Sequence, residues 1–188
     1  MDICKLKTVP GFSDMQNIKR SFFALRNGVV ADALKKGGAP FRIIFGLNLP
    51  QIVQIAESAP KSKTLAQLLW ANTSTRESLL LAPMLMPREE FSVSDALVWV
   101  TQVPSVEVAD VLCHRLLRYL PFAASLASDI LGKSNAAPLE RYTALRLLLN
   151  IIRINPALVQ QAADEERKRN CALTAPLCAQ IADELSFL

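Results

Sequence analysis

The chain has 188 residues, of which 51% are apolar, so it is long enough to bury a sizeable hydrophobic core. It has no run of about eighteen apolar residues, and it begins MDICKLKTVP without the apolar core of a signal peptide. These features exclude a membrane-spanning helix and predict a soluble cytoplasmic protein. The net charge of +4 favours a polyanionic partner without requiring one. The four cysteines match no zinc or disulfide pattern, so we expect no metal and no cofactor.

Apolar periodicity and helix-end signals predict an all-α protein of ten helices without strands. The expected helices span residues 14–36, 50–58, 64–72, 75–86, 93–102, 105–120, 122–131, 138–154, 156–169 and 175–186. The helix over 138–154 is apolar on most of its circumference, with Arg146, Asn150 and Arg153 along one polar line. We therefore expect it to be the most buried helix.

The helix ends rest on three kinds of signal. Three pairs fit the capping box, in which a side-chain oxygen and a residue three positions later satisfy each other's backbone amides: Ser13 with Gln16, Thr64 with Gln67, and Ser74 with Glu77. Proline suits a first helical position, as at Pro50, Pro138 and Pro156, the last with Asn155 as its cap. Gly132 and the run Lys36, Gly37, Gly38 are typical helix exits.

Paired helices restart about every 30 residues from Thr64 onward, and the second helix of each pair begins near Thr75, Ser105, Pro138 or Ala175. Such a period predicts an α-α superhelix, a solenoid of HEAT-like antiparallel helix pairs with a concave surface. Because no long Pro/Gly/Ser linker interrupts the chain, we expect a single domain over residues 1–188.

Two stretches carry a resemblance to a known family. FGLNLPQIVQIA at Phe45–Ala56 and LAQLLWANTSTRESLLLAPML at Leu65–Leu85 resemble the AlkD-like family of HEAT-repeat DNA-alkylation-repair proteins. Further matching positions are Trp70, the pair Arg76 and Glu77, the segment Val106 to Asp110, and Arg141. The resemblance covers residues 26–152.

The resemblance implies that a basic concave groove holds double-stranded DNA and that the protein hydrolyses the glycosidic bond of cationic alkylated purines. Asp110 matches the family's acidic position and would stabilise the sugar cation and orient water. The residues that we expect to contact DNA are Arg76, Arg141, Lys35, Lys36 and Arg42.

Other interpretations remain open at this stage. Asp110 can instead pair with His114, one helical turn away, and Arg141 can form a salt bridge to Asp110 in place of a phosphate contact. Val106 stands where the family has an aromatic residue. A DNA-binding homologue without catalysis is therefore one alternative, and a scaffold that binds a protein partner is another.

Overall fold

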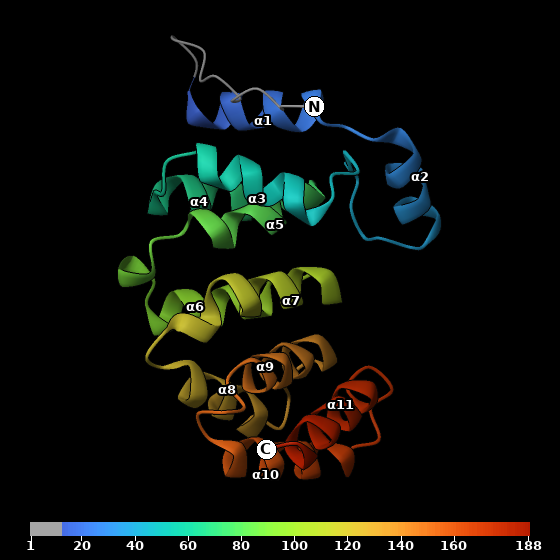
Figure 1. The fold of residues 1–188 in the computed structure, drawn as a ribbon, viewed down its shortest axis with the longest axis vertical. Helices are drawn as coiled ribbons and strands as arrows, with labels where there is room; N and C mark the ends of the chain where they lie inside the picture. Colours follow the sequence, from blue (N-terminus) through green and yellow to red (C-terminus); the bar gives the residue numbers. More distant parts are fainter. Residues whose placement is uncertain (1–12) are drawn as a thin grey trace. The chain divides into compact units, whose positions relative to one another are not determined.

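The computed structural model describes residues 13–188 and shows eleven α-helices and two short 3-10 helices within that range (Figure 1). No strand occurs in the described part of the chain, where an isolated bridge joins Ile43 to Thr75. The all-α class is thus confirmed for these residues. The chain divides into two compact units, one ending at Glu90 and the other spanning Phe91–Leu188. The superhelical arrangement stays a prediction, as does the single domain.

The first unit contains α1 (Asp14–Ala24), α2 (Gly28–Lys36), α3 (Leu49–Ser58), α4 (Lys63–Ala71), α5 (Arg76–Leu85) and η1 (Arg88–Glu90). Its centre is α5, which packs against α3 and α4. Nine of the ten residues of α5 are buried, compared with eight of thirteen in α9, the helix that the sequence suggested as the most buried. That expectation is wrong, because α5 also buries the polar residues of its first turn.

The helix expected over 14–36 is two helices. Asn27 ends the continuity: its side chain accepts a hydrogen bond from Val30 N at 3.2 Å, and its own backbone N–H donates to Phe45 O at 2.8 Å. An N-cap side chain and a tertiary backbone bond at one residue outweigh the helical pattern around it. As a result α2 turns away from α1 and buries only Ala31 among its residues.

The predicted caps are partly confirmed. The capping box of Ser13 and Gln16 is present, and Asn155 caps its helix by accepting from Leu158 N. The other two expected boxes are wrong. Ser62 rather than Thr64 caps α4, and Glu77 turns into the protein instead of back toward its own helix start.

The second unit contains α6 (Val93–Thr101), α7 (Val106–Arg115), η2 (Leu117–Tyr119), α8 (Ala123–Gly132), α9 (Pro138–Asn150), α10 (Pro156–Arg167) and α11 (Ala175–Ser186). The central helix is α9, which contacts α7, α8, α10 and α11. The helix expected over 105–120 breaks at Leu116, and the one expected over 138–154 ends at Asn150. Cys113 lies in the core, where its Sγ donates to Thr143 O at 3.3 Å. None of the described helices has both the length and the hydropathy needed to cross a membrane.

Candidate functional site

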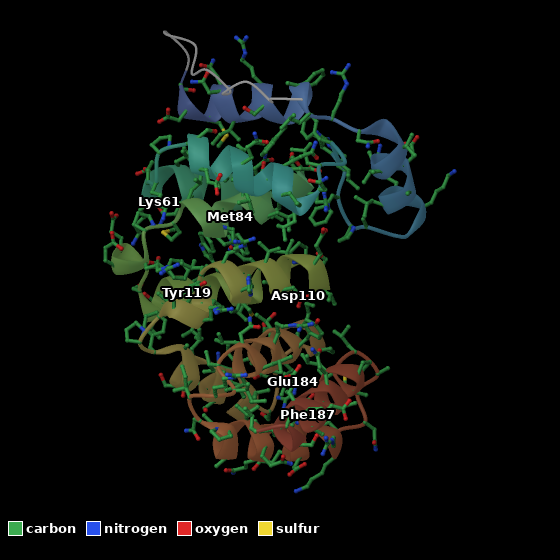
Figure 2. The ribbon with its side chains drawn as sticks, in the orientation of Figure 1. Lys61, Met84, Asp110, Tyr119, Glu184 and Phe187 are labelled. Carbon is green, nitrogen blue, oxygen red and sulfur yellow. The ribbon has the colours of Figure 1, made fainter. Side chains whose placement is uncertain are left out.

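The partly exposed carboxylate of Asp110 lies at the contact between α7 and α9 (Figure 2). Val108, Ala109, Val111 and Leu112 face the core on either side of it and fix the rotation of α7, so that the Asp110 side chain is left 39% exposed. On α9, buried leucines fix the helix in the same way, and two polar residues one turn apart, Tyr142 and Arg146, meet Asp110. The core packing thus places a carboxylate beside a phenol and a guanidinium.

Both partners of Asp110 act on the same oxygen. The Tyr142 hydroxyl donates to Asp110 Oδ1 at 3.0 Å, and Arg146 Nε lies 2.7 Å from that atom. Arg146 Nη2 also donates to the Tyr142 hydroxyl at 3.0 Å, which closes a triangle of three side chains. Within residues 13–188, Oδ2 has no such partner, so that this oxygen is available to a water molecule or a bound cation.

The electrostatics of the triangle follow from its half-buried position. Burial raises the pKa of Tyr142, and the nearby Asp110 charge adds to this, although the hydrogen bond and the positive charge of Arg146 oppose it. For Arg146, burial alone would lower the pKa, but the bonds to Tyr142 and the charge of Asp110 outweigh burial and raise it. Tyr142 therefore remains a protonated donor, and Arg146 remains charged.

Positive charge surrounds the next turn of α7. His114 Nδ1 lies 3.1 Å from Arg118 Nη1, and the pKa of His114 is lowered by burial and then by the charges of Arg118 and Arg115. His114 is therefore neutral near pH 7. The alternative in which Asp110 pairs with His114 is not the arrangement that the structure shows, since Arg146 takes that place.

Arg141 lies away from Asp110, inside the second unit. Only 6% exposed, it donates from Nε to Glu166 Oε2 at 2.7 Å, with a further short contact from Nη2 to the same oxygen. Its Nη1 donates to Leu131 O and Lys133 O. The predicted alternative of a salt bridge between Arg141 and Asp110 is therefore wrong, because Arg141 pairs with Glu166. The arrangement favours a structural role for Arg141, because a buried guanidinium that donates four hydrogen bonds to three protein oxygens has little surface left for a phosphate.

A cavity of about 200 Å³ opens beside Arg141 and is lined by residues of α8, α9 and α10. Two of its polar side chains, Gln161 and Glu165, bond each other at 3.0 Å. The cavity therefore has mixed charge, with the Glu165 carboxylate and the guanidiniums of Arg141 and Arg169 in its lining.

Arg76 occupies a corresponding position in the first unit. It is 5% exposed, and its Nη1 donates to Leu47 O and to Glu77 Oε1, both at 3.0 Å. Glu77 in turn accepts from the backbone N–H groups of Phe45, Gly46 and Leu47. This pair holds the loop before α3 in place, so that the geometry of Arg76 also favours a structural role.

The remaining residues that we expected to contact DNA are on the surface. Lys35 and Lys36 end α2, Arg42 lies in the loop that follows, and all three side chains are exposed. They belong to the first unit, whereas Asp110 belongs to the second. Of the five expected DNA contacts, Arg141 alone shares a unit with Asp110, and it does not belong to the triangle around that carboxylate.

Sequence reasoning missed Tyr142 and Arg146 as site residues. The signal that could have found them is the predicted period of about 30 residues, because Tyr142 follows Asp110 by 32 residues. Arg146 was already part of the polar line noted on its helix, and that line could have been matched to the polar face of α7. Within the described residues, no group of three His, Cys, Asp or Glu side chains is placed to hold a metal ion.

Comparison of the chain with protein-family models, with curated proteins and with solved structures finds no match. The resemblance to the AlkD-like family therefore rests on the two sequence stretches at Phe45–Ala56 and Leu65–Leu85 and on the few further matching positions. Any function has to be inferred from the geometry of the site.

Proposed function

We propose that this protein binds duplex DNA as a HEAT-like-repeat member of the DNA-alkylation-repair family and excises cationic alkylated purines by hydrolysis of the glycosidic bond. The observation that carries the proposal is the Asp110 carboxylate, half exposed on α7 and oriented through Oδ1 by Tyr142 and Arg146. Its position fits the acidic residue of the family motif.

The chemistry asks little of the protein. An alkylated ring nitrogen makes the purine cationic and a good leaving group, so that the sugar gains positive charge as the bond breaks. A fixed carboxylate stabilises that charge, because it is oriented before the reaction and does not have to reorganise. Oδ2 of Asp110 is the oxygen left to face the sugar or a water molecule, whereas Oδ1 is occupied by Tyr142 and Arg146.

The test is base release from duplex DNA that contains N7-methylguanine or N3-methyladenine, with protein in stoichiometric amount. We expect release above the protein-free rate, and loss of that release in Asp110→Asn. Asp129→Asn is the matched control, because Asp129 is an exposed carboxylate on another helix of the same unit. Equal release by Asp110→Asn and wild type would contradict the role of Asp110.

Tyr142→Phe tests the orientation of the carboxylate. The substitution keeps the ring and removes the hydroxyl that donates to Oδ1. We expect release about tenfold to a hundredfold slower with unchanged DNA affinity, since a hydrogen bond to a charged carboxylate contributes about 1.5–3 kcal/mol. A fall in affinity instead of rate would assign Tyr142 to DNA binding.

A second candidate, DNA binding without excision, is favoured by the ion pair itself. Arg146 balances the charge of Asp110 at 2.7 Å, and a neutral pair stabilises a sugar cation less than a free carboxylate does. Salt-sensitive gel-shift binding without base release would select this candidate. Absence of any duplex binding would remove both and leave the protein-interaction scaffold.

A further inference from the structure

The positive charge of the chain is concentrated in one segment. Residues 13–48 hold six Lys and Arg against two Asp and Glu, whereas residues 49–90 hold four against four. Residues 91–188 hold nine against ten. The basic residues are spread along the sequence, but their excess lies entirely in the N-terminal part. We call residues 13–48, which comprise α1, α2 and the loop before α3, the α1–α2 segment.

The cations of the α1–α2 segment are solvent-exposed. They are Lys19, Arg20, Arg26, Lys35, Lys36 and Arg42. Five of them, all except Arg20, form no ion pair within residues 13–188, whereas Arg76, Arg141 and Arg146 each pair with a carboxylate. The charge of these five exposed cations is therefore not neutralised by a nearby carboxylate, and the α1–α2 segment carries a positive potential at its surface.

The backbone holds these cations on rigid elements. Lys35 and Lys36 lie in the last turn of α2, and Arg26 stacks over the exposed ring of Phe23 with 4.6 Å between its guanidinium carbon and the ring centroid. The loop that carries Arg42 is fixed by the bridge between Ile43 and Thr75 and by the amides bound to Glu77. Because the backbone that carries these cations is already folded, binding a row of phosphates costs no ordering of the main chain.

We infer that the α1–α2 segment anchors the phosphate backbone of duplex DNA and supplies most of the chain's affinity for undamaged DNA, separately from the Asp110 site. The inference rests on the proposed function, because it takes DNA as the partner. We expect the anchor to respond to charge and not to base sequence, since lysine and arginine side chains that contact phosphates carry no sequence information. Lesion recognition is left to the second unit, whose charges are balanced.

The apolar surface of the segment favours DNA over a lipid surface. Membrane-binding helices present a broad apolar face, but α2 has nine residues, and its exposed large apolar side chains are Val29 and Val30. Phe23 is partly covered by Phe45, whose ring lies 5.9 Å away, centroid to centroid. Scattered apolar side chains of this kind are ordinary on a protein surface.

The experiment measures affinity of the full chain for an undamaged duplex over a range of salt concentrations. The test variant is Lys35→Gln, Lys36→Gln, Arg42→Gln. The control variant, Lys133→Gln, Arg153→Gln, Lys168→Gln, removes the same charge from three exposed positions of the second unit. All six side chains are exposed, so we expect both proteins to fold, which circular dichroism checks.

We expect the test variant to bind about tenfold or more weakly, with the slope of log affinity against log salt reduced by up to about 2.7, because each phosphate contact contributes about 0.9. The control variant should bind within about twofold of wild type. Equal losses in both variants would overturn the anchor in favour of an effect of net charge. Vesicles of phosphatidylserine and phosphatidylcholine that bind the wild type while the duplex does not would overturn it in favour of a membrane surface. Base release plays no part in this readout, so the anchor and the excision proposal can fail independently.

Discussion

Among residues 13–188, each of the two units has a buried Arg–Glu pair, but the pairs bind different neighbours. In the first unit, Arg76 and Glu77 are adjacent in sequence and bind the backbone of the loop at Phe45–Leu47. In the second, Arg141 and Glu166 come from α9 and α10, and Glu166 also accepts from the Thr174 hydroxyl at the start of α11. One pair closes a loop, and the other joins helices.

The two pairs show that the number of arginines in a basic protein does not indicate the positive charge of its surface, because some of them are buried. Arg76 and Arg141 lie on helices that also carry apolar stripes, and both guanidiniums are neutralised inside their units. The exposed excess of charge is left to residues 13–48. The site carboxylate, Asp110, belongs to the unit without that excess.

The largest expected effect is the loss of a buried pair. Glu77→Gln removes the carboxylate that balances the buried charge of Arg76, and we expect it to lower the free energy of unfolding by about 3–5 kcal/mol. Glu166→Gln should cost a similar amount in the second unit. Urea unfolding measures both. If Glu166→Gln costs less than about 1 kcal/mol, then the two pairs are not equivalent and the comparison fails.

Gly46→Ala tests the loop that Glu77 holds. Gly46 has a φ of +78°, and a Cβ there would collide with the backbone oxygen of Asn27 and lie 2.8 Å from Ala31 N. The left-handed backbone alone costs about 1–2 kcal/mol, and the collision adds to it. Gly28→Ala is the control, because a Cβ there meets nothing within 4 Å and alanine favours the helix. Unchanged thermal stability of Gly46→Ala would contradict the described approach of the loop to α2.

Asp110→Asn separates a surface pair from the buried ones. Because the Asp110 side chain is 39% exposed and that of Arg146 is 22% exposed, we expect a loss of at most about 1 kcal/mol in the free energy of unfolding. Urea unfolding at low and high salt checks this value. A loss comparable to that of Glu77→Gln would show that the triangle is a structural element and would weaken its assignment as a site.

The smallest expected effect concerns pH. The pKa of His114 is lowered in the folded protein, first by burial and then by Arg118 and Arg115. Below the ordinary value of 6.5 the unfolded chain therefore binds a proton that the folded chain binds only at lower pH, and stability falls as the pH falls. His114→Gln should remove part of this acid loss and leave stability at pH 8 unchanged. An identical pH profile for the two proteins would contradict the lowered pKa.

The sequence predicted the helices well, because their existence depends on local periodicity and on caps such as Ser13 and Asn155. It failed where a local signal competes with a distant one. Glu77 has the spacing of a capping box, but it binds backbone amides 30 to 32 residues earlier in the chain.

For a related reason, the sequence predicted the carboxylate of the site but not its partners. Asp110 was found from the motif, but its partner depends on how α9 is rotated against α7. Arg141 and Arg146 are five residues apart, which is about 140° around a helix, so that only one of them can face Asp110. The sequence of α9 contains both, and the packing of Tyr142 and the leucines decides between them.

Three groups of long-range hydrogen bonds, two in α7 and one in the loop before α3, have nearly the same sequence separation. Phe45 and Leu47 bond to Glu77, Cys113 bonds to Thr143, and Asp110 bonds to Tyr142. The two residues of each bond are 30 to 32 positions apart in the chain. During synthesis, α7 therefore lacks the hydrogen bonds that join it to α9 until about 30 further residues have left the ribosome. A truncation between Asp110 and Tyr142 would remove these bonds, and we expect it to leave α7 open to proteases.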